Sequence, residues 1–353
     1  MKVLAFCLIL VSWNLYAQDA VAPDGSKYYG QLREGIPHGQ GRLVAPDGTT
    51  YVGEFIDGRF HGKGRIQTPG GESYDAQFVD GRMTARGPSH YTEGAKAGYE
   101  AALLRQRPLL DAALASLTPS APGKVNLYLL AIAGDGEQEV FRREAEFVRA
   151  QFDRDFGTRG RSVALINSRT TLGSAPMATM ASIREALQAI AARMDRDNDI
   201  LFVFLTSHGS KEHEFRLHQN GTTLRGLRPA DLAQMLRETG VRWKAVVVSA
   251  CYAGGFLEPL KDERTLLIVA ARRDRPSFGC ADQNEFTWFG RAFFKDALAT
   301  SGSLGEAFDK AFALIAERET QEKIAAVDRS LPQIHNPRPI DDHLRRWWSQ
   351  FRP

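Results

Sequence analysis

Two short apolar runs, each followed at once by a chemically reactive side chain, constrain this chain most. Residues 200–206 (ILFVFLT) lead into His208 and Gly209, and residues 244–250 (KAVVVSA) lead into Cys251. Both runs are apolar on successive residues and rich in β-branched or aromatic side chains, which is typical of strands buried on both faces in a parallel sheet. In open α/β sheets, chemistry collects beyond the carboxyl ends of the strands. The sequence therefore predicts an imidazole and a thiol at one edge of a buried sheet.

The surrounding sequence alternates between strand and helix patterns, as βαβ units do. Further strands are predicted over residues 125–133, 162–167 and 265–271, and helices over residues 138–156, 177–194, 229–239, 287–299 and 304–319. The tail from Ser330 contains several prolines and is expected to be irregular, ending in an amphipathic segment with Trp347 and Trp348. The predicted fold class is α/β, with a mostly parallel sheet flanked by helices.

Residues 24–87 form an internal repeat. Tyr28, Tyr51 and Tyr74 recur every 23 residues, and each begins an alternation of aromatic and polar residues that turns on glycine. This pattern predicts stacked β-hairpins. The third unit departs from the first two, because Ala76 replaces a glycine. A small all-β module is therefore expected before the α/β domain.

The first 17 residues predict a secretory signal peptide. Lys2 precedes a short apolar core, and Leu15, Tyr16 and Ala17 form a plausible cleavage site. A buried N-terminal strand is the alternative. Export is expected, to the periplasm or the exterior of a bacterium, since arginine far outnumbers lysine, as in GC-rich genomes.

Charge and motifs narrow the possible partners. The formal net charge is +3, and no block of like charge indicates a nucleic-acid partner. No paired zinc Cys-x-x-Cys, phosphate loop or Gly-x-Ser-x-Gly occurs, so no metal and no cofactor are expected.

The thiol and the imidazole together suggest nucleophilic catalysis. A thiol attacks as a thiolate and needs a neighbour that takes its proton. Here Cys251 would be the nucleophile and His208 the base. If the two strands are neighbours, the backbone N–H groups of Gly209 and Cys251 would point at a developing oxyanion. Gly254 and Gly255 would let a substrate backbone approach. The alternatives are a structural disulfide to Cys280, or a histidine and a cysteine with only structural roles.

The segments Thr206-Ser207-His208-Gly209 and Ser249-Ala250-Cys251-Tyr252-Ala253-Gly254-Gly255 resemble the paired signatures of legumain-like cysteine peptidases, relatives of the caspases. The repeats resemble MORN repeats, most closely in the first two units. The resemblance implies a caspase-like α/β fold, a His–Cys dyad, and hydrolysis of a peptide or protein substrate, often after Asn or Asp. MORN repeats imply a protein or membrane-surface partner.

The chain departs from the legumain pattern at two places. Legumains orient the catalytic histidine with an Asn; Val140 falls near that place here, and Asp135 is the nearest polar substitute. Their Asn-binding pocket has an Arg, which Arg142 resembles, and a Glu two residues before the nucleophile, where this chain has Ser249. Asp282 is the candidate for a further acidic pocket residue. An ordinary solvated helix residue is the alternative for Arg142.

The resemblance implies a cysteine endopeptidase, and the predicted signal peptide implies its export. Its predicted parts are a signal peptide (1–17), MORN repeats (24–87), a helical segment with a linker (88–123), the peptidase domain (124–335) and a C-terminal tail (336–353). Two alternatives stay open: a MORN-based binding protein with an inactive peptidase-like domain, and a thiol transamidase or ligase.

Overall fold

The computed structural model describes residues 20–22, 24–69, 71–87, 90–91, 93–219, 222, 224–282 and 284–351. Contacts divide the chain into two compact units, Met1–Glu100 and Ala101–Pro353. The predicted signal peptide lies outside the described residues. Within the described part of the chain, no helix has the length and apolar character needed to cross a membrane.

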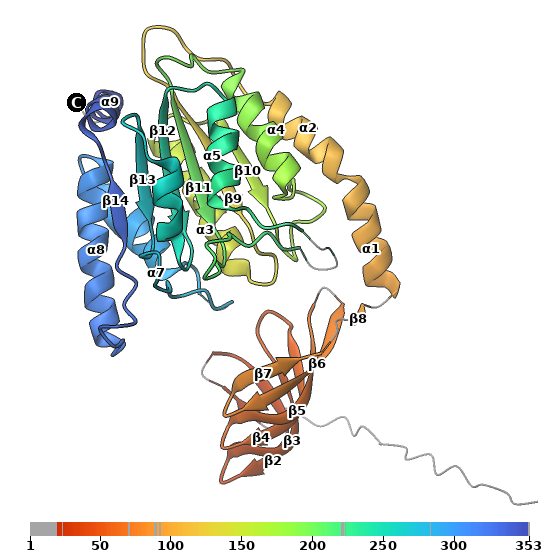
Figure 1. Cartoon of the computed structure of the whole chain (residues 1–353). Coiled ribbons are helices and arrows are strands. Elements are labelled where there is room, and N and C mark those ends of the chain that lie inside the picture. Colours follow the sequence, from red (N-terminus) through yellow and green to blue (C-terminus); the bar gives the residue numbers. More distant parts are fainter. Residues whose placement is uncertain are drawn as a thin grey trace, which may run out of the picture. The chain divides into compact units, whose positions relative to one another are not determined.

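The first unit is an antiparallel sheet of consecutive hairpins (Figure 1). Strands β1 to β7 follow one another across the sheet in chain order, and β8 pairs with β6. The strands are β1 (Ala20–Val21), β2 (Lys27–Arg33), β3 (Ile36–Val44), β4 (Thr50–Ile56), β5 (Arg59–Gln67), β6 (Glu72–Val79), β7 (Arg82–Arg86) and β8 (His90–Tyr91). The predicted stack of hairpins is confirmed.

Equivalent tight turns close the three repeated hairpins. An acidic residue and a glycine, both in the left-handed region, form each turn: Glu34 with Gly35 (φ 51° and 78°), Asp57 with Gly58 (48° and 78°), and Asp80 with Gly81 (49° and 80°). Positive φ at both central residues is the geometry of two-residue hairpin turns whose twist matches that of the strands. The 23-residue period therefore reflects one hairpin geometry used three times.

Glycines make room for the repeated tyrosines. Tyr51 is buried, and a Cβ on Gly64 would lie 2.3 Å from its Cε2, whereas one on Gly53 would lie 2.4 Å from its hydroxyl oxygen. Gly53 and Gly64 are directly opposite each other in the β4–β5 ladder. In the third unit, Tyr74 stacks under the Arg86 guanidinium instead, 3.9 Å from the ring centroid.

The second unit contains a six-stranded sheet in the order β10-β9-β11-β12-β13-β14. Its first five strands are parallel, and β14 pairs antiparallel with β13. The strands are β9 (Leu127–Ala133), β10 (Ser162–Ile166), β11 (Ile200–Thr206), β12 (Trp243–Ser249), β13 (Thr265–Val269) and β14 (Gln333–His335). The mostly parallel α/β sheet predicted from the apolar runs is confirmed.

Helices cover both faces of this sheet (Figure 1). One face packs against α3 (Glu139–Asp155), α7 (Trp288–Gly290), a π-helical segment (Arg291–Ala297), α8 (Leu304–Gln321) and α9 (Arg338–Trp348). The other packs against α2 (Gln106–Ala115), α4 (Met180–Ala191) and α5 (Pro229–Glu238). α6 (Leu257–Leu260) belongs to this second face as well. The described chain also has α1 (Glu93–Leu104) and two short 3-10 helices, Ala253–Phe256 and Leu298–Thr300.

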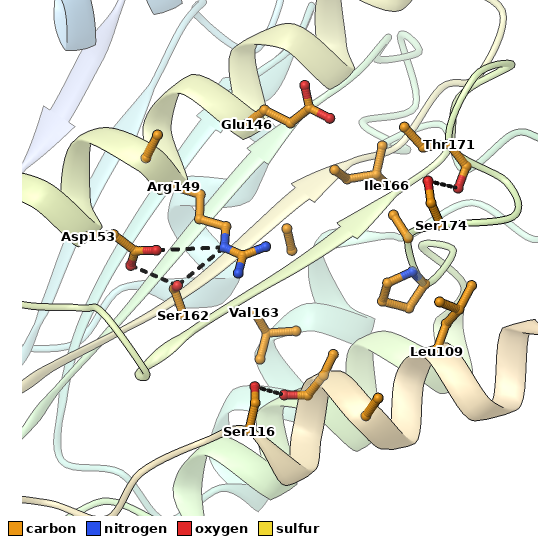
Figure 2. A pocket seen from close by; sticks show the side chains of 16 residues that line it. Leu109, Ser116, Glu146, Arg149, Asp153, Ser162, Val163, Ile166, Thr171 and Ser174 are labelled. Carbon is orange, nitrogen blue, oxygen red and sulfur yellow. Dashed lines mark hydrogen bonds and ion pairs between the residues drawn. The ribbon is translucent and has the colours of Figure 1, made fainter.

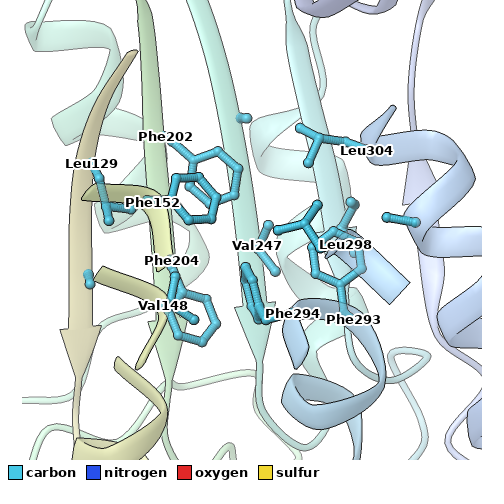
Figure 3. Packing of buried hydrophobic residues seen from close by; sticks show 14 of the residues in the cluster. Leu129, Val148, Phe152, Phe202, Phe204, Val247, Phe293, Phe294, Leu298 and Leu304 are labelled. Carbon is cyan, nitrogen blue, oxygen red and sulfur yellow. The ribbon is translucent and has the colours of Figure 1, made fainter. Parts of the chain in front are cut away.

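Large aromatic side chains fill the core under the two central strands. Phe202 and Phe204 project from β11 toward Phe152 and Phe294, with ring centroids 4.7 Å apart in each pair (Figure 3). Burying an aromatic side chain is among the largest single contributions to a core. This packing holds β11 in one register, because a slip of one residue would replace these rings with the smaller side chains of Leu201, Val203 and Leu205, which pack on the opposite face.

The expectation of an irregular C-terminal tail is wrong. β14 extends the sheet, and α9 buries Trp347 completely in the core. The prolines do not prevent this, because Pro337 caps α9 and Pro339 lies in its first turn, where a helix needs no N–H donor.

Substituting Gly64 with alanine is expected to destabilise the first unit by about 1–3 kcal/mol, since the new methyl group overlaps the buried Tyr51 ring. Amide hydrogen exchange in β4 and β5 should accelerate by roughly 5- to 150-fold. Gly98→Ala is the matched control, because a Cβ at that position meets no atom within 4 Å. Unchanged protection in Gly64→Ala would contradict the proposed role of the glycines.

Candidate functional site

The parallel register of β11 and β12 brings the predicted dyad segments together. Thr206 is directly opposite Ser249, and His208 and Cys251 each follow two residues later. A Cβ on Gly209 would lie 2.0 Å from the Cys251 carbonyl oxygen, so only glycine fits there. The segments that bear the imidazole and the thiol therefore run side by side at the carboxyl end of the sheet.

The Cys251 sulfur contacts the backbone of the loop that follows β13. Its Sγ accepts a hydrogen bond from the Ser277 N–H (3.2 Å) and donates one to the Ser277 carbonyl (3.4 Å). No hydrogen bond joins it to His208 among the described residues. Burial raises the pKa of the Cys251 thiol, and the Ser277 N–H opposes this shift. The resting sulfur is thus a thiol held against the loop.

Cys251 and Cys280 are both free thiols, so the alternative of a structural disulfide is not realised. Burial, and next the nearby Cys251, raise the pKa of Cys280 to about 12. A thiol with such a pKa is a poor nucleophile near neutral pH. Of these two cysteines, Cys251 is the better candidate for chemistry.

The His208 imidazole packs edge-on against Phe141, with ring centroids 5.1 Å apart. Burial lowers the pKa of His208, the Asp135 carboxylate opposes that shift, and Arg216 adds to it. Asp135 is fully buried; its carboxylate accepts a hydrogen bond from the Glu137 N–H (2.8 Å) and pairs with Arg216 (2.9 Å). His208 is therefore a neutral imidazole in the field of a buried carboxylate.

The backbone around the dyad leaves two donors available. In the described part of the chain, the N–H groups of Gly209 and Cys251 donate to no other residue. Tyr252 adopts a left-handed conformation (φ 55°), which turns the chain sharply after Cys251. Free donors beside a nucleophile are what an oxyanion requires.

Gly254 and Gly255 lie where the chain packs closely against itself. A Cβ on Gly254 would lie 2.4 Å from the Arg273 backbone nitrogen, and one on Gly255 would lie 2.1 Å from the His213 ring. Neighbouring segments of this chain occupy the space beside both glycines. Both glycines also line a cavity of about 690 Å³, so their role in admitting a substrate backbone stays a prediction.

Two of the predicted substrate-binding residues, Arg142 and Asp282, meet in one polar network around Glu139. Arg142 pairs with Glu139 (2.5 Å) and Glu146 (2.6 Å) on its own helix. Asp282 accepts the Glu139 backbone N–H (2.7 Å) and pairs with Arg169 (2.7 Å). Both side chains are thus engaged within the protein.

The third predicted residue, Ser249, lies in a separate buried cluster. Its hydroxyl contacts Thr287 Oγ1 (3.0 Å), and the Thr287 N–H donates to Glu144 (3.0 Å). Glu144 is fully buried, and burial raises its pKa to about 7, against the lowering effects of Thr287, Ser249 and Thr206. A Cβ on Gly290 would overlap its carboxylate. Glu144 therefore lies beneath the ends of both strands that lead to the dyad.

Glu144 was not predicted from the sequence, although its position on the buried face of the helix could have indicated it. The buried stripe of α3 includes Val140, Phe141, Ala145 and Val148, and Glu144 falls within that stripe. A carboxyl group on the apolar face of a helix needs a buried partner. Ser277 gave no such signal, because it contacts Cys251 through backbone atoms.

A cavity of about 520 Å³ borders His208 and Gly209. A second hollow, of about 610 Å³, runs along the edge strand β10 and shares no lining residue with the first (Figure 2). In the second hollow, Arg149 donates to Ser162 (3.3 Å) and lies 3.8 Å from Asp153. Its charges are therefore balanced internally.

One cluster in the described residues has the side chains that could hold a metal ion: Asp135, Glu137 and His218, with ligand atoms within 4.8 Å of one another. Arg216 already pairs with Asp135 (2.9 Å) and Glu137 (3.2 Å). The guanidinium thus supplies the positive charge that a metal ion would otherwise bring.

Glu144→Gln is expected to remove a pH dependence of stability. The carboxyl has a pKa of about 7 when folded and near 4.5 when unfolded, so folding favours its protonated form. Its stabilisation is complete below pH 4.5 and is lost as pH rises through 7, by about 3 kcal/mol at most. Urea unfolding at pH 5 and pH 8 measures this loss.

The matched control is Glu146→Gln, two residues along the same helix and partly exposed. It should keep the pH dependence of the wild-type protein. An identical fall in stability between pH 5 and pH 8 in Glu144→Gln would contradict the assignment.

Comparison with known families gives two matches. Residues 184–335 match the Peptidase C13 family, and residues 28–50 and 51–73 match the MORN repeat. No curated protein matches the chain. The first match includes both His208 and Cys251, and the second covers the first two hairpin units but not the divergent third. The chain's resemblance to the legumain family of peptidases, with MORN repeats before the peptidase-like region, is thereby confirmed.

Proposed function

We propose that the second unit is a cysteine endopeptidase with Cys251 as nucleophile and His208 as its proton acceptor. The observation that supports this best is the register of β11 and β12, with Thr206 opposite Ser249 and the Gly209 backbone against the Cys251 carbonyl. A nucleophile and a base on adjacent strand ends are the minimum that acyl transfer requires.

The electrostatics favour general-base catalysis from a neutral pair. Burial raises the pKa of Cys251 and lowers that of His208, so the ion pair of thiolate and imidazolium is disfavoured at rest. The sulfur would leave the Ser277 carbonyl, transfer its proton to His208 and attack the peptide carbonyl. His208 would return the proton to the leaving amine. It would then take a proton from the water that attacks the thioester and give it to the departing Cys251 sulfur, which frees the acid product and restores the thiol. The N–H groups of Gly209 and Cys251 would stabilise each oxyanion.

Asp135 is our candidate for the group that positions His208. Val140, near the place where legumains have an Asn, is buried in the apolar core. Asp135 instead lies close enough for its charge to raise the pKa of His208. A buried carboxylate would stabilise the imidazolium that forms during catalysis.

Cleavage after Asn or Asp is the specificity that the legumain resemblance suggests. Arg142 would contribute to this specificity only if its guanidinium bound the substrate while still paired with Glu139. Asp282 would likewise have to bind the substrate while paired with Arg169. Ser249 would support the site indirectly, because its hydroxyl contacts Thr287, which in turn donates to the buried Glu144.

The N-terminal segments bear on the location and the partners of the protein. The first 17 residues suggest export, to the periplasm or outside a bacterial cell. The MORN repeats would bind a protein or a membrane surface. An inactive peptidase-like binding protein and a thiol transamidase or ligase remain the competing hypotheses.

Cys251→Ala and His208→Ala should each lower kcat/KM for peptide hydrolysis by at least about 10³-fold, because each removes one half of the dyad. Cleavage of a peptide library, with products identified by mass spectrometry, measures the rate and the preferred residue. Cys280→Ala is the matched thiol control and should retain activity.

Wild-type protein that hydrolyses no peptide would favour the inactive binding protein. Products joined to an added amine, in excess over hydrolysis, would favour the transamidase.

The pH dependence of kcat/KM should show an acid limb below pH 6.5. His208 must be unprotonated to act as base, and burial lowers its pKa from the usual 6.5. Since Asp135 raises the pKa of His208, Asp135→Asn should move the acid limb further toward low pH. A wild-type limb above pH 6.5, or an upward shift in Asp135→Asn, would contradict this electrostatic account.

A further inference from the structure

The cavity beside His208 lies on the imidazole side of the dyad. Its lining includes His208, Gly209, Glu214, Arg216 and Gly226, whereas Cys251 is not among its described lining residues. With a volume of about 520 Å³ it can hold a long side chain. A group bound in this cavity would therefore lie beside the His208 imidazole rather than beside the Cys251 sulfur.

The mechanism determines which part of a substrate would enter this cavity, an argument that rests on the proposed peptidase function. The sulfur stays bonded to the acyl half of the substrate, whereas the imidazole donates its proton to the departing amine. The residue that follows the scissile bond must therefore lie on the imidazole side. A cavity that borders His208 but not Cys251 is placed to receive it.

Glu214 supplies an uncompensated negative charge to this cavity. Its side chain is partly buried, and within the described residues its carboxylate has no ion pair and no hydrogen bond. A Cβ on Gly226 would lie 2.3 Å from Glu214 Oε1, so the carboxylate rests directly on that backbone. A glycine at position 226 is thus required for Glu214 to occupy this place.

The arginines near Glu214 are paired with other acids. Arg216 pairs with Asp135 (2.9 Å) and Glu137 (3.2 Å), so two carboxylates share one guanidinium. Arg225 pairs with Asp231 through both carboxylate oxygens (2.8 and 2.9 Å). Among the described residues that line the cavity, the Arg216 charge is thus already paired within the protein, whereas the Glu214 charge is not.

We propose that this cavity is the subsite for a basic side chain, lysine or arginine, on the residue that follows the scissile bond. Glu214 is its ion-pair partner. A partly buried carboxylate without a partner gains most from an incoming cation, because solvent screens the pair only in part. Peptides with an acidic residue at that position are repelled.

Three peptides that differ only in the residue after the scissile bond, Lys, Gln or Glu, test the subsite. The wild-type protein should show a kcat/KM for the Lys peptide at least about 10-fold above that for the Glu peptide. Glu214→Gln should reduce this ratio to within about 2-fold, and Glu214→Lys should invert it. Glu212→Gln is the matched control, because Glu212 is exposed on the same loop, does not line the cavity, and should leave the ratio unchanged.

Cleavage with no preference, or a preference that survives in Glu214→Gln, would overturn the subsite while leaving the peptidase proposal intact. If no peptide is cleaved, fluorescence anisotropy of the labelled peptides with Cys251→Ala decides between the two proposals. Tighter binding of the Lys peptide that is lost in Cys251→Ala/Glu214→Gln would support the subsite alone. Equal binding of all three peptides would overturn it.

Discussion

The register between β11 and β12 is the constraint on which the site depends. Seven consecutive residue pairs, from Ile200 opposite Trp243 to Thr206 opposite Ser249, align the two strands. The alignment is held by the core rather than by the site, because buried aromatic rings pack under these strands. Both faces of these strands are apolar, so a shift of one residue would not expose them, but in β11 it would exchange the phenylalanine side chains for smaller ones in each core. It would also separate the imidazole from the thiol. Core packing and chemistry therefore share one geometric requirement.

Buried carboxyl groups surround the dyad on two sides. Glu144 lies under the strand ends and is protonated at moderately acidic pH, whereas Asp135 lies beside His208 and shares a guanidinium with Glu137. Because burial penalises charge, each carboxyl needs hydrogen bonds or a cation nearby. Glu144 accepts the Thr287 N–H, and Asp135 pairs with Arg216. The site thus contains two kinds of acid: Glu144, whose pKa is about 7, and Asp135, which is paired with Arg216.

Much of the fold follows from the sequence, because its signals are local. The apolar runs predicted β11 and β12, the 23-residue period predicted the hairpins, and the reactive side chains after the runs predicted which segments would meet. Contacts made through backbone atoms or between distant segments gave no such signal. The Ser277 backbone on the Cys251 sulfur, and Trp347 buried by a proline-capped helix, depend on tertiary packing. The pairing of Arg142 with Glu139 has the i,i+3 spacing at which opposite charges meet on a helix, so only the burial of Glu139 required the structure.

The central claim is that Cys251 is a nucleophile activated by His208. Labelling the intact chain with a peptide-based electrophile, followed by mass spectrometry of its tryptic fragments, tests it most directly. The account predicts modification of Cys251 and not of Cys280, and loss of that modification in His208→Ala. Preferential labelling of Cys280, or undiminished labelling of Cys251 without His208, would contradict it.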